Sequence, residues 1–340
     1  MSNRNINILY YNTDIQSKDT VLNACIPIDI NVSFTDSFQK LYEMIISLDE
    51  IDLVFIDYNG EEEVLKIISS IHKYDEDLVI YVLSHITDDE EQIKIYSSGA
   101  TEYLLLPVNS QVLQARLKNM AGLRDSRRKL NKEVESAVSV IKERELESLL
   151  LLGRTSEYKD RDTGSHILRV GRYSELIMEK LGGSKEDQEL MLYAAPLHDV
   201  GKIGIPDSIL NKNTKLTEEE YAVMKTHTIK GYNILSGTKS KYLDAGAIIA
   251  LSHHEKYDGT GYPNALKGED IPLYGRIVAI ADVFDALISE RVYKNSWTLE
   301  HTLDYIKSQS GTHFDPALTE VFLKNINEAE KIIKSLPPKL

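Results

Sequence analysis

The chain has 340 residues, of which 42% are hydrophobic and 27% are charged, a composition typical of folded domains rather than of disordered or fibrous proteins. Its formal net charge of −14 argues against nucleic-acid polymers and anionic membranes as partners, because both bind clustered Lys and Arg. No apolar run approaches the ~18 residues of a membrane-spanning helix, a signal-peptide pattern is lacking, and the single cysteine, Cys25, cannot form an internal disulfide. We therefore expect a cytoplasmic protein of about two domains with no membrane span.

The first 120 residues alternate strand-like and helix-like patterns. Short apolar runs typical of strands buried on both faces occur at 6–11, 53–57, 78–84 and 102–106. Helical periodicity lies between these runs, at 37–48, 61–72 and 88–98. Repeated βα units with short connections predict a parallel, doubly wound sheet. This order of elements resembles the receiver domain of response regulators over about residues 5–120.

The chemistry of a receiver domain is only partly present. Receivers are phosphorylated on an Asp at the end of their third strand, and Asp57 takes this place at the end of the run 53–57. Ser84 matches the hydroxyl residue that ends the following strand. The acidic pair that holds Mg²⁺ in receivers is replaced by Asn12 and Thr13, and the lysine before the last proline is replaced by Leu106. A bound metal would keep one strong carboxylate ligand, and a phosphoryl group would lose its cation. We therefore interpret this segment as a degenerate receiver and do not expect phosphorylation of Asp57.

A charged segment without proline, residues 123–149, follows the predicted receiver domain at 1–122. Its apolar residues are spaced 4, 3 and 4 apart, as in the seam of a two-stranded coiled coil: Leu130, Val134, Ala137 and Ile141. We expect a helical linker that pairs two chains in a homodimer. A helix packed on its own domains would show the same spacing.

The remaining residues, 150–340, have the pattern of an all-helical domain with loops at 201–215, 255–272 and 310–316. Thr217 and Glu220 form a capping box that begins one of the helices. The predicted fold class is therefore multidomain: a doubly wound α/β receiver-like domain followed by an all-α helical bundle.

Histidines and aspartates recur together in this helical half. His198 precedes Asp199 at the end of an apolar run, His227 falls on an apolar helical stripe, and Asp282 lies in an almost wholly apolar helix. A single inward histidine is usually a core residue with a hydrogen bond, and a buried ionised Asp needs a cation or strong donors to compensate for its charge. Several imidazole and carboxylate groups without thiolate indicate a centre for Fe, Mn, Zn or Ni.

The motifs of this half resemble those of the HD-GYP domain, a branch of the HD phosphohydrolases. In chain order they are RDTGSHILRV, LHDVGKIGIPDSIL, MKTHTIKGYNIL, SHHEKYDGTGYP, RIVAIADVFDALIS and GTHFDP. The resemblance covers residues 150–325, and its most specific motif, HHExxDGxGYP, is intact at 253–263. It implies hydrolysis of cyclic di-GMP to linear pGpG, and in some members to GMP.

The resemblance also implies a metal centre of two or three divalent ions, with a metal-bridging hydroxide as the nucleophile. By position, the ligands of two ions would be His166, His198, Asp199, His227, His253, His254 and Asp282, with Asp199 bridging. Members with a third ion have a Glu four residues before the first histidine, and Asp162 takes that place here. Fe or Mn is the expected metal, and Ni and Zn share the same ligand chemistry.

Further residues are assigned to the substrate by the same resemblance. Three cations match phosphate-binding positions: Lys202, Arg291 and Lys294. Tyr262 is expected to contact the phosphate or base of the substrate. Asp285 either relays a proton, which places it with Asp199 and Lys202 among the catalytic residues, or only holds Arg291. Glu255 is expected to orient a metal ligand.

The function that we predict is a cyclic di-GMP phosphodiesterase, and two alternatives stay open. The first is an HD phosphohydrolase acting on another cyclic dinucleotide or nucleotide, which the intact GYP segment disfavours. The second is a cyclic di-GMP-responsive interaction module that binds a GGDEF-type cyclase. The complete ligand set disfavours a role in binding alone.

Overall fold

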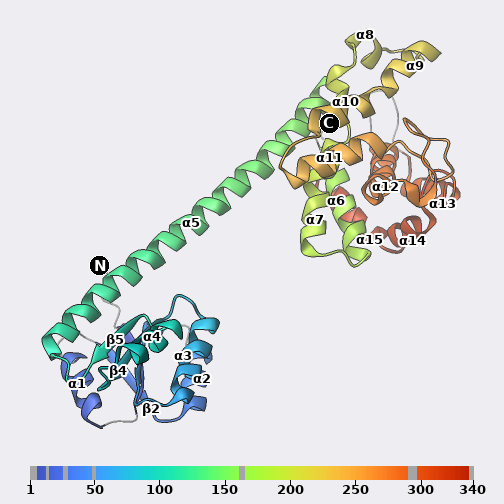
Figure 1. Ribbon diagram of the computed structural model, residues 1–340. Coiled ribbons are helices and arrows are strands. Elements are labelled where there is room, and N and C mark those ends of the chain that lie inside the picture. The colour runs from blue at the N-terminus through green and yellow to red at the C-terminus, as the bar shows by residue number, and fades with distance from the viewer. Residues whose placement is uncertain are drawn as a thin grey trace. The chain divides into compact units, whose positions relative to one another are not determined.

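A computed structural model describes residues 6–12, 15–25, 30–47, 51–160, 165–289 and 297–336 (Figure 1). The chain divides into two compact units, Met1–Ala137 and Val138–Leu340. Among the helices in the described ranges, none combines the length and the apolar character needed to cross a membrane.

The N-terminal unit is built on a five-stranded parallel sheet. Its strands are β1 (Ile6–Tyr11), β2 (Ile30–Thr35), β3 (Leu53–Asp57), β4 (Val79–Ser84) and β5 (Glu102–Leu105). The connecting helices are α1 (Ile15–Cys25), α2 (Phe38–Ser47), α3 (Glu62–Tyr74) and α4 (Asp89–Ser97). The strand order β2-β1-β3-β4-β5 is that of the flavodoxin-like doubly wound fold, to which receiver domains belong. The predicted α/β architecture is therefore confirmed.

The two faces of this sheet are covered by different helices. Val54 and Ile56 of β3 belong to a core shared with α2, α3 and α4, whereas Leu53 and Phe55 face α1 and the first part of α5 (Ser110–Lys159). Every residue of β3 is buried as a result, and Asp57 stands at its carboxyl end. The strand order reverses between β1 and β3, and this reversal opens the crevice in which doubly wound folds place their functional groups.

Helix α5 (Ser110–Lys159) runs for 50 residues, and the boundary between the two units lies within it. It includes the whole of the predicted linker at 123–149. The side chains of Leu130, Val134 and Ile141 are 59%, 52% and 65% exposed. The predicted domain limits and the predicted pairing of two chains remain predictions.

The C-terminal unit is all-helical over its described residues, and this part of the predicted fold class is also confirmed. Its α-helices are α6 (His166–Lys180), α7 (Lys185–Ala194), α8 (Asp207–Leu210), α9 (Glu218–Lys225), α10 (His227–Leu235), α11 (Lys241–Ser252), α12 (Leu273–Ile288), α13 (Leu299–Ser308), α14 (Pro316–Lys324) and α15 (Ile326–Ser335). Three short 3₁₀ helices are η2 (Ala195–Leu197), η3 (Val200–Gly204) and η4 (Gly268–Asp270). The predicted capping box of Thr217 and Glu220 begins α9.

The core of this unit centres on α6 and α12. Tyr173 of α6 and Phe284 of α12 are fully buried, with their ring centroids 5.1 Å apart. Helices α7 and α15 also pack on α6, and α11 packs on both α7 and α12. This packing holds one end of α6 and the middle of α12 against the loop between η2 and η3.

Candidate metal centre

Seven of the eight predicted metal ligands meet where several helices of the C-terminal unit begin or end. Their ligand atoms form two groups, and within each group all of these atoms lie within 4.8 Å of one another. The first group is Asp199, His227, His253 and His254, and the second is His166, His198 and Asp282. The eighth predicted ligand, Asp162, lies outside the described residues, as do the predicted substrate-binding residues Arg291 and Lys294.

A close approach of backbones brings the first group together. Gly201 of η3 faces the first turn of α10, and a Cβ at this position would lie 1.9 Å from the carbonyl oxygen of His227 and 2.4 Å from the backbone nitrogen of Gly231. Only glycine fits such a contact without displacing one of the two segments. Asp199, two residues before Gly201, thereby reaches to 3.3 Å from Nε2 of His227.

Three of the histidines are oriented by backbone carbonyls. Nδ1 of His198 lies 2.9 Å from the oxygen of Ala195, Nδ1 of His227 lies 2.8 Å from that of Met224, and Nδ1 of His253 lies 3.1 Å from that of Ile249. Because a carbonyl can only accept, Nδ1 must carry the proton, and in the neutral ring Nε2 carries a lone pair.

These lone pairs have no hydrogen-bond partner among the described residues. Four such atoms are buried without a hydrogen bond: Nε2 of His198, His227 and His253, and Oδ1 of Asp199. Buried acceptors without a donor are rare in folded proteins because they lose water and gain nothing in return. A divalent cation satisfies lone pairs of this kind, and a set of imidazoles and carboxylates fits such ions. The residues therefore fit the metal centre that the sequence implies.

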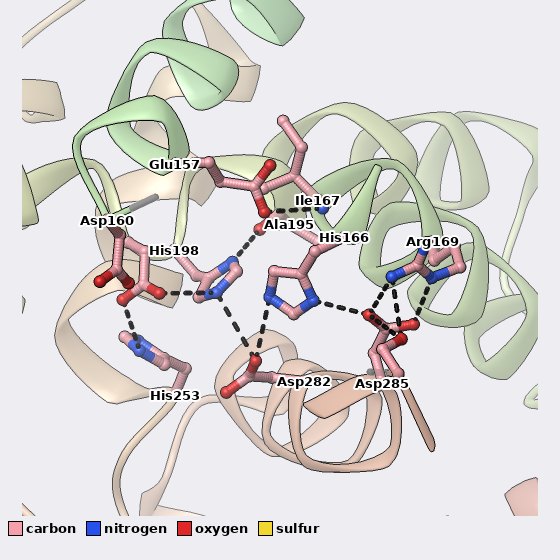
Figure 2. Close-up of polar contacts among 12 residues, drawn as sticks. Glu157, Asp160, His166, Ile167, Arg169, Ala195, His198, His253, Asp282 and Asp285 are labelled. Atoms are coloured by element: carbon pink, nitrogen blue, oxygen red, sulfur yellow. Dashed lines mark hydrogen bonds and ion pairs between the residues drawn. The ribbon is translucent and has the colours of Figure 1, made fainter. Parts of the chain in front are cut away.

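The fourth histidine, His166, is oriented by a carboxylate. Its Nδ1 lies 2.7 Å from Oδ2 of Asp285, and its Nε2 lies 3.3 Å from Oδ1 of Asp282, so that the ring stands between two acids (Figure 2). Burial lowers the pKa of His166, but the hydrogen bonds to Asp282 and Asp285 outweigh burial and raise that pKa to about 10. Asp285 in turn accepts from Nε and Nη2 of Arg169, at 2.6 and 2.8 Å.

The contact between Arg169 and Asp285 was not predicted from the sequence. Arg169 follows His166 by three positions and so shares its helix face, and this spacing could have indicated that Arg169 lies near the site. Of the two predicted roles for Asp285, contact with Arg291 falls outside the described residues. The structure places Asp285 on the far side of His166 from Asp282 (Figure 2). Its role as a proton relay remains a prediction.

The helical half of the chain matches a known family. Residues 125–318, more than half of the chain, match the family described as HD domain. The chain belongs to the HD domain family. The resemblance to the HD phosphohydrolases is thereby confirmed.

Curated relatives extend the match beyond the HD domain. The "Cyclic di-GMP phosphodiesterase response regulator RpfG" of Xanthomonas campestris pv. campestris is 41% identical over 263 residues, which are 75% of this chain and 70% of the relative. The "Cyclic di-GMP phosphodiesterase" of Thermotoga maritima is 36% identical over 310 residues, 86% of this chain and 83% of the relative. The "3'3'-cGAMP-specific phosphodiesterase 2" of Vibrio cholerae is 44% identical over 197 residues, 58% of this chain and 38% of the relative.

Electrostatics in the HD domain keep the first ligand group ready for a cation. Burial, followed by the nearby imidazole of His227, lowers the pKa of His254 to about 3, so that its ring is neutral near pH 7. Burial raises the pKa of Asp199, but Lys202, His198 and His227 together outweigh burial and hold that pKa well below its ordinary value. Nζ of Lys202 lies 2.7 Å from Oδ2 of Asp199 and 2.6 Å from Oδ2 of Asp160. Asp160 is a further site residue that the sequence analysis missed.

The GYP loop of the HD domain, residues 255–272, covers one side of this group. The ring of Tyr262 stacks on the ring of His254, with centroids 4.8 Å apart and an interplanar angle of 29°. The carboxylate of Glu255 accepts from the backbone nitrogens of Asn264 and Leu266, at 2.7 and 3.1 Å. Glu255 therefore holds this part of the loop in place, and its expected role in orienting a metal ligand remains a prediction.

The phosphorylation site of a receiver is occupied by hydrogen bonds in this chain. Asp57 is buried, and its Oδ1 accepts from the hydroxyl of Tyr10 at 2.5 Å while its Oδ2 accepts from Nδ2 of Asn12 at 2.7 Å. Oγ of Ser17 lies 3.0 Å from both oxygens. Thr13 lies outside the described residues. These contacts favour the interpretation that the receiver-like domain is not phosphorylated, which remains a prediction.

Proposed function

We propose that the HD domain of this chain hydrolyses cyclic di-GMP. The observation that carries the proposal is the convergence of two ligand groups on buried lone pairs that have no donor among the residues the structure describes. Relatives named cyclic di-GMP phosphodiesterases, which align with 75% and 86% of this chain, support the choice of substrate. Addition of water to one phosphodiester breaks one P–O bond and gives linear pGpG, and a second hydrolysis gives GMP.

The two ligand groups would each hold one divalent ion, and Asp162 would add a ligand for a third. Fe or Mn suits a set of imidazoles and carboxylates without thiolate. Two such ions lower the pKa of a water molecule and bind the oxygens of a phosphate during in-line attack. Asp199 belongs to the first group, and its Oδ2 also lies 3.3 Å from Nε2 of His198 in the second, which supports a bridging role for this carboxylate.

Residues around the ions would bind the substrate. We assign Lys202 to a phosphate oxygen, because its ammonium group lies beside Asp199 at the centre of the site. Tyr262 would contact the phosphate or base, since its ring is stacked on His254 at the edge of the same site. Arg291 and Lys294 complete the set of phosphate-binding cations by their place in the sequence.

A second candidate substrate is another cyclic dinucleotide. The relative of Vibrio cholerae named a 3'3'-cGAMP-specific phosphodiesterase is 44% identical to this chain over the aligned residues, and this likeness favours the alternative. A role as a cyclic di-GMP-responsive module that binds a GGDEF-type cyclase is compatible with the same set of residues.

We also propose that the protein acts as a homodimer in the cytoplasm. The exposed apolar residues of α5 support pairing of two copies through a coiled coil, because isolated helices bury such a stripe only against a partner. The single cysteine fits a reducing compartment.

The test begins with anaerobically purified protein incubated separately with cyclic di-GMP, 3'3'-cGAMP and pGpG. Products are resolved by chromatography, and bound metals are counted on the same sample. We expect turnover of cyclic di-GMP that a chelator removes, and its loss by at least about 100-fold in Asp199→Ala. The exposed His301 supplies the matched control, since His301→Ala removes an imidazole outside the ligand groups and should keep full turnover.

Two results would contradict the proposal. Hydrolysis that survives complete removal of metal would exclude the assigned centre. Metal-loaded protein without hydrolysis of cyclic di-GMP would point to another dinucleotide if 3'3'-cGAMP is cleaved, and to the interaction module if neither is cleaved.

A further inference from the structure

Arg169 and Asp285 form a buried ion pair directly behind one of the ligand groups. Their residues are 1% and 0% exposed. Besides its two bonds to Asp285, the guanidinium donates to Oγ of Ser165 at 2.9 Å, to Oγ of Ser289 at 3.0 Å and to the backbone oxygen of Leu336 at 3.1 Å. A planar group with five N–H donors can satisfy this many fixed acceptors at once, and lysine cannot. Acceptors at the start of α6, at the end of α12 and on the residue that follows α15 therefore fix the position of the Arg169 guanidinium.

His166 differs from three other histidines of the centre, including His198 of its own group, in the partner of its Nδ1 atom. Nδ1 of His198, His227 and His253 faces backbone carbonyls, which belong to the helices themselves. Nδ1 of His166 faces the carboxylate of Asp285. A carboxylate partner makes an imidazole a stronger ligand than a carbonyl partner does, and it depends on side chains that a substitution can remove.

We propose that Arg169 is the positioning residue for the metal site formed by His166, His198 and Asp282. It fixes the carboxylate of Asp285, and through it the orientation and donor strength of His166. In the other group, His227 and His253 are oriented by backbone carbonyls of their own segments instead. The inference rests on the proposed metal centre and adds that different residues orient the ligands of its two metal positions.

A purely structural role for the ion pair predicts a different result. Loss of a structural pair would loosen the packing of α6 on α12 and weaken both metal positions together. Loss of a positioning residue weakens the position that contains His166 and spares the other. The ratio of the two affinities separates these roles.

The experiment uses the full-length protein, dialysed against a series of Mn²⁺ concentrations, with bound Mn²⁺ counted per chain. In Arg169→Met we expect one class of site to weaken by about 10–100-fold while the other keeps the affinity of the unaltered protein. Electron paramagnetic resonance should show isolated ions in place of neighbouring, coupled ones. Arg169→Lys keeps the positive charge but lacks the planar set of N–H donors, and it should therefore keep part of the affinity that Arg169→Met loses.

A matched control lies one turn further along α6. Arg172 is exposed and pairs with Glu175 at 2.9 Å, so Arg172→Met removes the same side chain without touching the site. Where Arg169→Met does not fold, Asp285→Asn and Arg169→Lys carry the test, since both should weaken the same class of site selectively, Arg169→Lys to a smaller extent. Binding by these variants that equals that of the unaltered protein, or equal weakening of both classes, would overturn the inference. Unaltered protein that binds no Mn²⁺ would instead overturn the proposed centre itself.

Discussion

The contact at Gly201 leads to a prediction whose size can be worked from the structure. In Gly201→Ala, the added Cβ would lie 1.9 Å from the carbonyl oxygen of His227, whereas such contacts are not found below 3.0 Å. The two segments must therefore separate by at least about 1 Å. Both neighbouring atoms belong to the backbone of α10, so a side-chain rotation cannot relieve the clash.

The separation should reduce activity more than stability. Overpacking of a close contact costs about 1–3 kcal/mol, which lowers the midpoint of thermal unfolding without abolishing the fold. Asp199 and His227 lie on opposite sides of the contact, and a displacement of 1 Å in a catalytic site can reduce turnover about 100-fold. We expect a loss of this order in kcat/KM for cyclic di-GMP, together with fewer bound metal ions per chain.

Two other glycines provide controls for the same substitution. In Gly204→Ala, in the same 3₁₀ helix, the nearest atom is Cδ of Lys230 at 2.8 Å, a flexible side chain that can move away. In Gly122→Ala, on α5, the added Cβ has no described atom within 4 Å beyond its own stretch of helix, and removal of a helical glycine should stabilise the protein by about 1 kcal/mol. Full activity and stability of Gly201→Ala would refute the argument, as would equal losses in Gly204→Ala.

Three further predictions concern the rest of the chain. Acetyl phosphate should change neither turnover nor oligomeric state, because Asp57 is already hydrogen-bonded; a phosphorylated Asp57 in mass spectrometry would contradict this. Burial raises the pKa of Cys25 to about 11, so near pH 8 it should be alkylated about 100-fold more slowly than an ordinary thiol, and its contribution to stability should fall as pH rises from about 9 to 11; rapid labelling of folded protein would refute its burial. Ile141→Glu, on the exposed face of α5, should yield monomers in light scattering, whereas dimers that persist would exclude this seam.

The hydrophobic pattern of the sequence was sufficient to predict the strongly buried strands. Strands β1, β3, β4 and β5 coincide with apolar runs, because helices cover both faces of the sheet. The strand β2 was missed, since it lies at the edge of the sheet and its exposed and partly buried residues alternate. A half-exposed edge strand has no continuous apolar run to distinguish it.

The sequence also predicted which side chains form the centre, through motifs that resemble those of a known family, and the structure brings seven of the eight together. Only the tertiary structure decided how these groups are divided and what supports them. Arg169 and Asp285 are 116 residues apart in the chain and meet because α6 packs on α12. Glu255 likewise accepts from the backbone nitrogens of Asn264 and Leu266, contacts that its place in the motif did not predict. The spacing of residues along a chain shows which chemical groups are present. Their hydrogen-bond partners depend on how distant segments pack together, and a local sequence pattern does not contain that information.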